Sequence, residues 1–128
     1  PRILVNEGPA VLVHGDKLFI SYSASATDEN YCMGLLWIDL NADPRQPANW
    51  HKSARPVSLP ATKIVSTARV TTALRKRRKG KMCWCITRGI TPKLRRPLYD
   101  PNRHTRLKLV RWNESGMPDF GIPPADTL

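Results

Sequence analysis

The chain has 128 residues, with 21 Lys and Arg against 10 Asp and Glu and a formal net charge of +11. This length allows one small domain or part of a larger one, and a hydrophobic fraction of 41% argues against a disordered chain. No apolar run approaches the roughly 20 residues of a membrane-spanning helix, and the first residues do not resemble a signal peptide. We therefore expect no membrane partner and leave the cellular compartment open.

The positive charge is concentrated in one segment. Residues 61–96 hold 12 of the basic residues and none of the acidic ones, whereas the rest of the chain holds 9 basic and 10 acidic residues. A nearly neutral domain is thus interrupted by a basic segment of different character. Either this segment is a nucleic-acid-binding insert, or it is not the sequence with which the fold evolved.

Short β-prone runs separated by turns predict an all-β fold. In chain order we expect a hairpin from residues 10–14 and 17–22, a loop at 23–30, a buried strand at 31–40, a structured loop with an aromatic anchor at 41–53, a strand at 107–112 and a turn at 113–116. No part outside the basic segment has the 3.6-residue period of an amphipathic helix. The pattern favours a sandwich, barrel or propeller. Because two or three hairpins leave apolar surface and strand edges open, we expect part of a larger domain.

The cysteines give little functional information. Three cysteines cannot form a complete set of disulfide bonds. Cys83 and Cys85 lie in the basic segment, which leaves Cys32 alone in the remainder. Because a single Cys-x-Cys pair is a poor zinc signature, we expect free thiols.

Several runs outside the basic segment share one resemblance to known sequences. They are Asn6-Glu7-Gly8-Pro9, Tyr22-Ser-Ala-Ser-Ala-Thr-Asp28, Asn30-Tyr-Cys-Met-Gly-Leu-Leu36, Pro97-Leu-Tyr-Asp-Pro-Asn-Arg-His-Thr-Arg106, and Trp112-Asn113 through Gly116 to Pro118-Asp-Phe-Gly121. Over residues 3–58 and 97–126 they resemble glycoside hydrolase family 43, and most closely its arabinofuranosidase-like members. The resemblance implies that residues 1–128 are a fragment of one domain, a partial five-bladed β-propeller made of its later blades.

The resemblance also implies an activity. Members hydrolyse arabinosides or xylosides of plant cell-wall polysaccharide with inversion, using two aspartates and a glutamate. The glutamate of Glu-Gly-Pro is the general acid, which assigns that role to Glu7. Inversion needs an acid and a base roughly 6.5–9.5 Å apart, and the acid must hold its proton near neutral pH. In the family's order both aspartates lie upstream of Pro1, so we expect the isolated chain to be inactive.

Further site residues are weaker candidates. The resemblance places an arginine of the last blade near the sugar hydroxyls, and both Arg103 and Arg106 qualify; a surface arginine paired with Asp100 is the alternative. Tyr31 is a third candidate for substrate binding. The family also holds a central metal, often calcium, through the histidine of a Gly-Pro-Gly-His-Asn-Ser-Phe motif. That motif is absent here, so we expect that the chain retains no metal ligand or cofactor.

The genetic code offers an origin for the basic segment. Between residues 58 and 97 the family has the motif just named, followed by a strand resembling Asp-Val-Leu-Val-Tyr-His-Ala. Reading the codons of residues 81–86 one nucleotide earlier forces Val-Leu-Val and permits Asp before it and Tyr after it. The same shift permits the first motif at residues 67–74. We hypothesise that about 62–96 is translated out of frame, through a decayed gene or a sequencing error.

This hypothesis has a structural consequence. Residues 75–81 carry six positive charges in seven positions, and their repulsion opposes compact packing. Out-of-frame residues were also never selected to bury one face of a strand. We therefore expect the basic segment to be poorly ordered.

Two non-catalytic functions remain as alternatives. Trp37, Trp50 or Trp112 could stack on a sugar, although packing within the protein also accounts for each. The basic run 75–81 could contact phosphates with a salt-dependent affinity. Trp84 is the single aromatic residue of the basic segment, so there is no base-stacking platform and we expect no specific nucleic-acid partner.

Overall fold

The computed structural model describes residues 5–24, 32–58, 72–76, 81–89 and 103–121. Its strands are β1 (Glu7–His14), β2 (Lys17–Ala24), β3 (Cys32–Asp39), β4 (His51–Lys52), β5 (Thr72–Lys76), β6 (Met82–Gly89), β7 (Arg103–Leu109), β8 (Arg111–Trp112) and β9 (Pro118–Asp119). The helical element within these ranges is a single short 3-10 turn, η1 (Pro47–Asn49), and no helix there is long enough to cross a membrane. The all-β prediction is therefore confirmed for the described residues.

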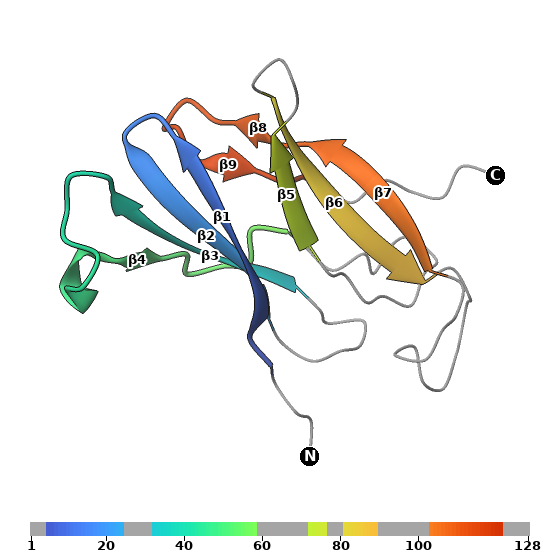
Figure 1. The fold of residues 1–128 in the computed structure, drawn as a ribbon, viewed down its shortest axis with the longest axis horizontal. Helices are drawn as coiled ribbons and strands as arrows, with labels where there is room; N and C mark the ends of the chain where they lie inside the picture. Colours follow the sequence, from blue (N-terminus) through green and yellow to red (C-terminus); the bar gives the residue numbers. More distant parts are fainter. Residues whose placement is uncertain (1–4, 25–31, 59–71, 77–80, 90–102, 122–128) are drawn as a thin grey trace.

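The strands form three antiparallel sheets, with strand orders β1-β2-β3-β4, β5-β6-β7 and β8-β9. In Figure 1 the first sheet and the β5–β7 sheet lie side by side, and the small β8–β9 ribbon lies between their upper ends in this view. The partial set of sheets does not close into a ring within the described residues. The five-bladed architecture is thus not visible in this chain.

The predicted hairpin is confirmed and is longer than expected. β1 and β2 pair directly across the turn, with His14 opposite Lys17 and Val11 opposite Ile20. Gly15 has a φ of 58°, a left-handed conformation that a glycine adopts without the penalty of a Cβ atom. β3 then pairs along the whole of β2 and confirms the buried strand predicted at 31–40.

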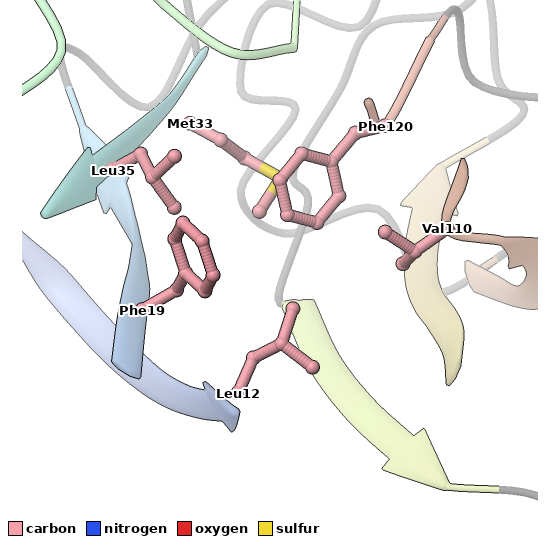
Figure 2. Packing of buried hydrophobic residues seen from close by; sticks show 6 residues of the cluster. All are labelled: Leu12, Phe19, Met33, Leu35, Val110 and Phe120. Atoms are coloured by element: carbon pink, nitrogen blue, oxygen red, sulfur yellow. The ribbon is translucent and has the colours of Figure 1, made fainter. Parts of the chain in front are cut away.

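One hydrophobic cluster joins the first sheet to the C-terminal strands. Its buried members are Leu12, Phe19, Met33, Leu35, Val110 and Phe120. Figure 2 shows the first four, from β1, β2 and β3, facing the last two across the core. Because Phe19 and Phe120 are both 0% exposed, the C-terminal residues are part of the same folded unit as the first hairpin.

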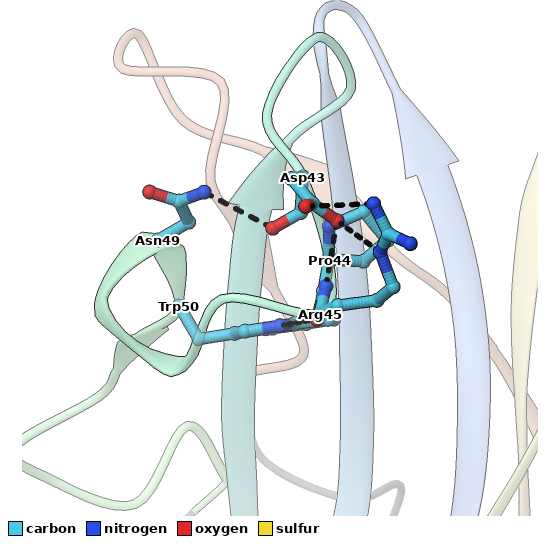
Figure 3. A network of polar contacts seen from close by, with 5 residues as sticks. All are labelled: Asp43, Pro44, Arg45, Asn49 and Trp50. Atoms are coloured by element: carbon cyan, nitrogen blue, oxygen red, sulfur yellow. Dashed lines mark hydrogen bonds and ion pairs between the residues drawn. The ribbon is translucent and has the colours of Figure 1, made fainter.

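The loop between β3 and β4 is ordered by its own polar contacts, as predicted for 41–53. The Arg45 guanidinium donates to both carboxylate oxygens of Asp43, at 3.0 and 3.1 Å, and thereby lowers the pKa of that carboxyl group. The Asn49 side chain donates to the Asp43 carbonyl, and the Trp50 indole N–H donates to the Pro44 carbonyl at 2.9 Å. Figure 3 shows these contacts closing the loop on itself.

The structure corrects one expectation about the basic segment. Residues 72–76 and 82–89, which we expected to be poorly ordered, form β5 and β6, and β6 pairs with β5 on one edge and with β7 on the other. Strand pairing uses backbone groups, and the run Met82–Ile86 is rich enough in β-prone residues to join a sheet whatever its origin. The other residues of 61–96, apart from Lys81, lie outside the described residues.

Candidate functional site

Glu7 lies at the first position of β1, where the strand is irregular. The register shifts between Glu7 and Ala10, and Gly8 between them has a φ of 60°. A bulge of this kind redirects neighbouring side chains and is common beside functional sites. The sequence Glu-Gly-Pro explains the irregularity, because glycine accepts the left-handed backbone and proline cannot donate to the ladder. The Glu7 side chain is exposed to solvent.

An open pocket of about 330 Å³ adjoins this end of β1. Its lining residues come from the start of β1 and from β2, β3 and β4: Asn6, Glu7, Pro9, Ile20, Tyr22, Leu36 and Lys52. Most of the wall is apolar, and within this lining Glu7 is the only carboxylate and Lys52 the only cation. A protonated carboxyl group here could donate to a ligand lying against the apolar wall, while the ammonium could bind a hydroxyl or an anion.

The apolar wall depends on a close approach between Tyr22 and Gly34. The two residues are opposite each other in the β2–β3 pairing. A methyl group at Gly34 would overlap the Tyr22 ring, so the ring lies directly against the backbone of β3. Sequence reasoning did not identify Tyr22 or Lys52 as pocket residues, because their placement depends on the strand register and not on a local motif.

Two of the other predicted substrate-binding residues can be placed by their backbone alone. Arg103 and Arg106 lie on β7, in the β5–β7 sheet, and pair through the backbone with Gly89 and Ile86. Tyr31 lies outside the described residues. Their roles stay predictions that follow from the resemblance.

The described residues offer no metal centre. No group of three or more His, Cys, Asp or Glu among them is arranged to hold a metal ion. The expected loss of the family's metal-binding histidine stays a prediction, and we derive no step through a metal. Cys32 and Cys83 are free thiols, as expected, and burial raises the pKa of the Cys32 thiol.

The tryptophans of the described residues make contacts within the protein. Trp112 stacks on His14 with ring centroids 3.6 Å apart and also contacts Phe19, while Trp37 stacks on His51 at 5.5 Å. Both residues also pack against the hydrophobic cluster. These contacts favour the packing interpretation of Trp37 and Trp112 over sugar stacking.

Comparison with known sequences extends over nearly the whole chain. The model of the family described as "Glycosyl hydrolases family 43" matches residues 1–118. The chain is 44% identical over 124 residues to an extracellular exo-alpha-(1->5)-L-arabinofuranosidase of Streptomyces avermitilis, and 42% identical over 124 residues to alpha-L-arabinofuranosidase 43 of Humicola insolens. In both cases the alignment covers 95% of this chain and 26% of the relative. The chain thus spans about a quarter of the curated relatives that it matches.

Solved structures of known proteins also resemble this chain. The crystal structure of an alpha-L-arabinofuranosidase from Lactobacillus brevis has a TM-score of 0.85 and 38% identity, and the match covers 97% of this chain and 39% of that one. A xylan beta-1,4-xylosidase from Bacillus halodurans has a TM-score of 0.66 at 14% identity, covering 94% of this chain and 23% of that one. At that low identity the second match shows a shared fold alone.

Proposed function

Because the chain belongs to glycosyl hydrolases family 43, we propose that it is the acid-bearing part of a longer glycosidase that acts on α-L-arabinofuranosides. The observation that supports this role is the position of Glu7. It is the carboxylate of a Glu-Gly-Pro segment, and it lines an open pocket with an apolar wall. We further propose that the longer protein is a five-bladed β-propeller to which these sheets contribute later blades.

The reaction assigned to this site is hydrolysis of an O-glycosyl bond. Glu7 transfers its proton to the glycosidic oxygen as the bond from the sugar carbon to that oxygen breaks. A water molecule attacks the same carbon from the opposite face and gives its proton to a second carboxylate, which inverts the configuration. Within the described pocket lining Glu7 is the only carboxylate, so the base comes from another part of the protein.

Arabinose is favoured over xylose as the sugar. The relatives with 40–44% identity over 124 residues are arabinofuranosidases, and so is the structure with 38% identity. The xylosidase match has only 14% identity and carries information on the fold alone. We therefore propose terminal α-L-arabinofuranosyl groups as the substrate class.

The role of Glu7 can be tested in a complete protein. A chimera would carry residues 1–58 of this chain, which hold all the pocket residues, in place of the matching part of the Streptomyces avermitilis relative. In this chimera Glu7→Gln should lower kcat/KM for an arabino-oligosaccharide by about 10²–10⁴-fold. The loss should be smaller for 4-nitrophenyl α-L-arabinofuranoside, because its leaving group needs little protonation.

The matched control is Asp39→Asn, which removes an exposed carboxylate at the end of β3, outside the pocket. It should leave both rates nearly unchanged. If Glu7→Gln cleaved the arabino-oligosaccharide as fast as the unmodified chimera, Glu7 would not be the general acid.

A further inference from the structure

The loop between β3 and β4 carries a tryptophan that the hydrophobic core does not use. Trp37 and Trp112 pack against the hydrophobic cluster, whereas Trp50 does not belong to that packing. Within the described ranges no other aromatic ring stacks on Trp50, and the residue is half-buried. The interpretation of sugar stacking, which the contacts of Trp37 and Trp112 disfavour, is therefore open to Trp50.

Two hydrogen bonds hold Trp50 in place. Its indole N–H donates to the Pro44 carbonyl at 2.9 Å, and its backbone N–H donates to the Pro47 carbonyl at 3.1 Å. The polar edge of the ring is thus satisfied within the loop, and the remainder of the ring is an apolar surface. An aromatic ring that is fixed before a ligand arrives loses little conformational entropy on binding. The loop therefore presents Trp50 as a preorganised surface.

Two polar side chains gather around the dipeptide Asp43-Pro44 that holds Trp50. Arg45 donates to the Asp43 carboxylate through Nε and Nη2, and its side chain is 87% exposed. Asn49 donates to the Asp43 carbonyl at 3.0 Å, and Figure 3 shows its side-chain oxygen pointing away from the network. Neither this oxygen nor Nη1 of Arg45 has a hydrogen-bond partner among the described residues. The loop thus offers a donor and an acceptor close to an aromatic ring.

This combination of groups fits a sugar. A sugar ring has C–H groups that pack against an aromatic surface, and its hydroxyl groups both donate and accept hydrogen bonds. The charge of Arg45 is balanced by Asp43, with the Nε atom 3.0 Å from a carboxylate oxygen. Because the pair is neutral as a whole, it attracts a phosphate or carboxylate only weakly. A neutral ligand rich in hydroxyl groups is therefore favoured over an anion.

The loop lies at the end of the β1–β4 sheet opposite to Glu7. Glu7 is opposite Ser23, and Ser23 is opposite Met33 near the start of β3. The loop follows Asp39, at the other end of β3. With a rise of about 3.4 Å per residue, this part of β3 separates the two sites by roughly 20 Å. A single sugar in the Glu7 pocket cannot reach the loop, whereas a polysaccharide can contact both.

We propose that Trp50, Arg45 and Asn49 form a second carbohydrate-binding site, which holds a neutral polysaccharide bearing arabinose at a distance from the Glu7 pocket. The choice of arabinose rests on the proposed function, whereas the binding of a sugar by this loop does not. No bond is made or broken at the second site. Its effect is to keep a long substrate close to the protein between successive cleavages.

The 128-residue chain itself can be tested, because binding at the loop requires no hydrolysis. Arabinohexaose would be titrated into the ¹⁵N-labelled chain and followed by NMR, in about 0.3 M NaCl so that the excess positive charge is screened. The signals of the Trp50 indole N–H and the Asn49 side-chain amide should shift with increasing sugar. The indole signals of Trp37 and Trp112, which pack within the protein, should not. Maltohexaose is the control ligand and should shift none of them.

Variants of the loop give a second measurement. Trp50→Ala should weaken the affinity for arabinohexaose by about tenfold, as expected for an aromatic residue at the centre of a contact. Trp50→Phe retains a flat ring and should recover part of this loss. Leu40→Ala is the matched control, because Leu40 is 48% exposed and precedes the loop, and it should leave the affinity unchanged.

Three results would overturn the proposal. They are an unchanged Trp50 indole signal at saturating arabinohexaose, equal shifts with maltohexaose, and equal affinities of the unmodified chain and Trp50→Ala. The titration of the unmodified chain decides the question even if Trp50→Ala does not fold. None of these measurements involves Glu7 or hydrolysis, so their failure is distinct from a failure of Glu7→Gln.

Discussion

At the scale of the residue, Gly34 shows how a missing side chain shapes the pocket. The Tyr22 ring occupies the space that a Cβ atom at position 34 would need. The ring is held against β3 and forms part of the wall beside Glu7. Neither residue belongs to a catalytic motif, yet each limits the shape of the pocket.

This close contact predicts the effect of Gly34→Ala. The added methyl group must displace the Tyr22 ring or the strand, which should lower the free energy of unfolding by about 1–3 kcal/mol. Chemical denaturation of the isolated chain would measure this change. In the double variant with Tyr22→Ala, the added cost of Gly34→Ala should largely disappear. Equal costs of Gly34→Ala in the presence and absence of Tyr22 would contradict the overlap.

At the scale of the element, β5 and β6 show that a strand can form in a segment of unusual composition. Both strands pair in register within the β5–β7 sheet despite the positive charge of residues 61–96. The resemblance to the family predicts a strand in this region. The shifted reading of the codons gives the Val-Leu-Val of that strand at positions within β6. Formation of the strand therefore does not decide whether its residues are in frame.

The out-of-frame hypothesis makes a prediction about DNA. Sequencing of the coding region for residues 58–97, read one nucleotide earlier, should show Gly-Pro-Gly-His-Asn-Ser-Phe followed by Asp-Val-Leu-Val-Tyr. The first motif is the stronger test, because the single codons of Met82 and Trp84 force Val-Leu-Val in the shifted reading whatever the origin of the segment, whereas the first motif is only permitted. If the shifted reading lacked the first motif or contained stop codons, the basic segment would be a genuine part of the protein.

At the scale of the whole molecule, the core depends on residues from the two ends of the described sequence. Phe19 on β2 and Phe120 after β9 are both completely buried in one cluster. Trp112 on β8 reinforces this connection by stacking on His14 at the end of β1. The N-terminal hairpin and the C-terminal strands therefore stabilise each other.

This arrangement predicts that Phe120→Ala destabilises the N-terminal sheet as well. Removal of the ring leaves a cavity that should cost about 3–5 kcal/mol, a large part of the stability of a small domain. Val13→Ala, at a position that is 55% exposed, is the control and should cost much less. Hydrogen exchange of the β1–β3 amides would measure the coupling. Unchanged protection of these amides in Phe120→Ala would show that the two ends fold independently.

The strand-rich class, the first hairpin and the family follow from the sequence alone, because turn residues, β-prone runs and the runs that resemble the family are local in the chain. The sequence also indicated Glu7 as the candidate acid. Only the tertiary structure placed Tyr22 against Gly34, Lys52 in the pocket and His14 on Trp112. Those contacts depend on strand register and on packing between distant segments, which no short stretch of sequence specifies.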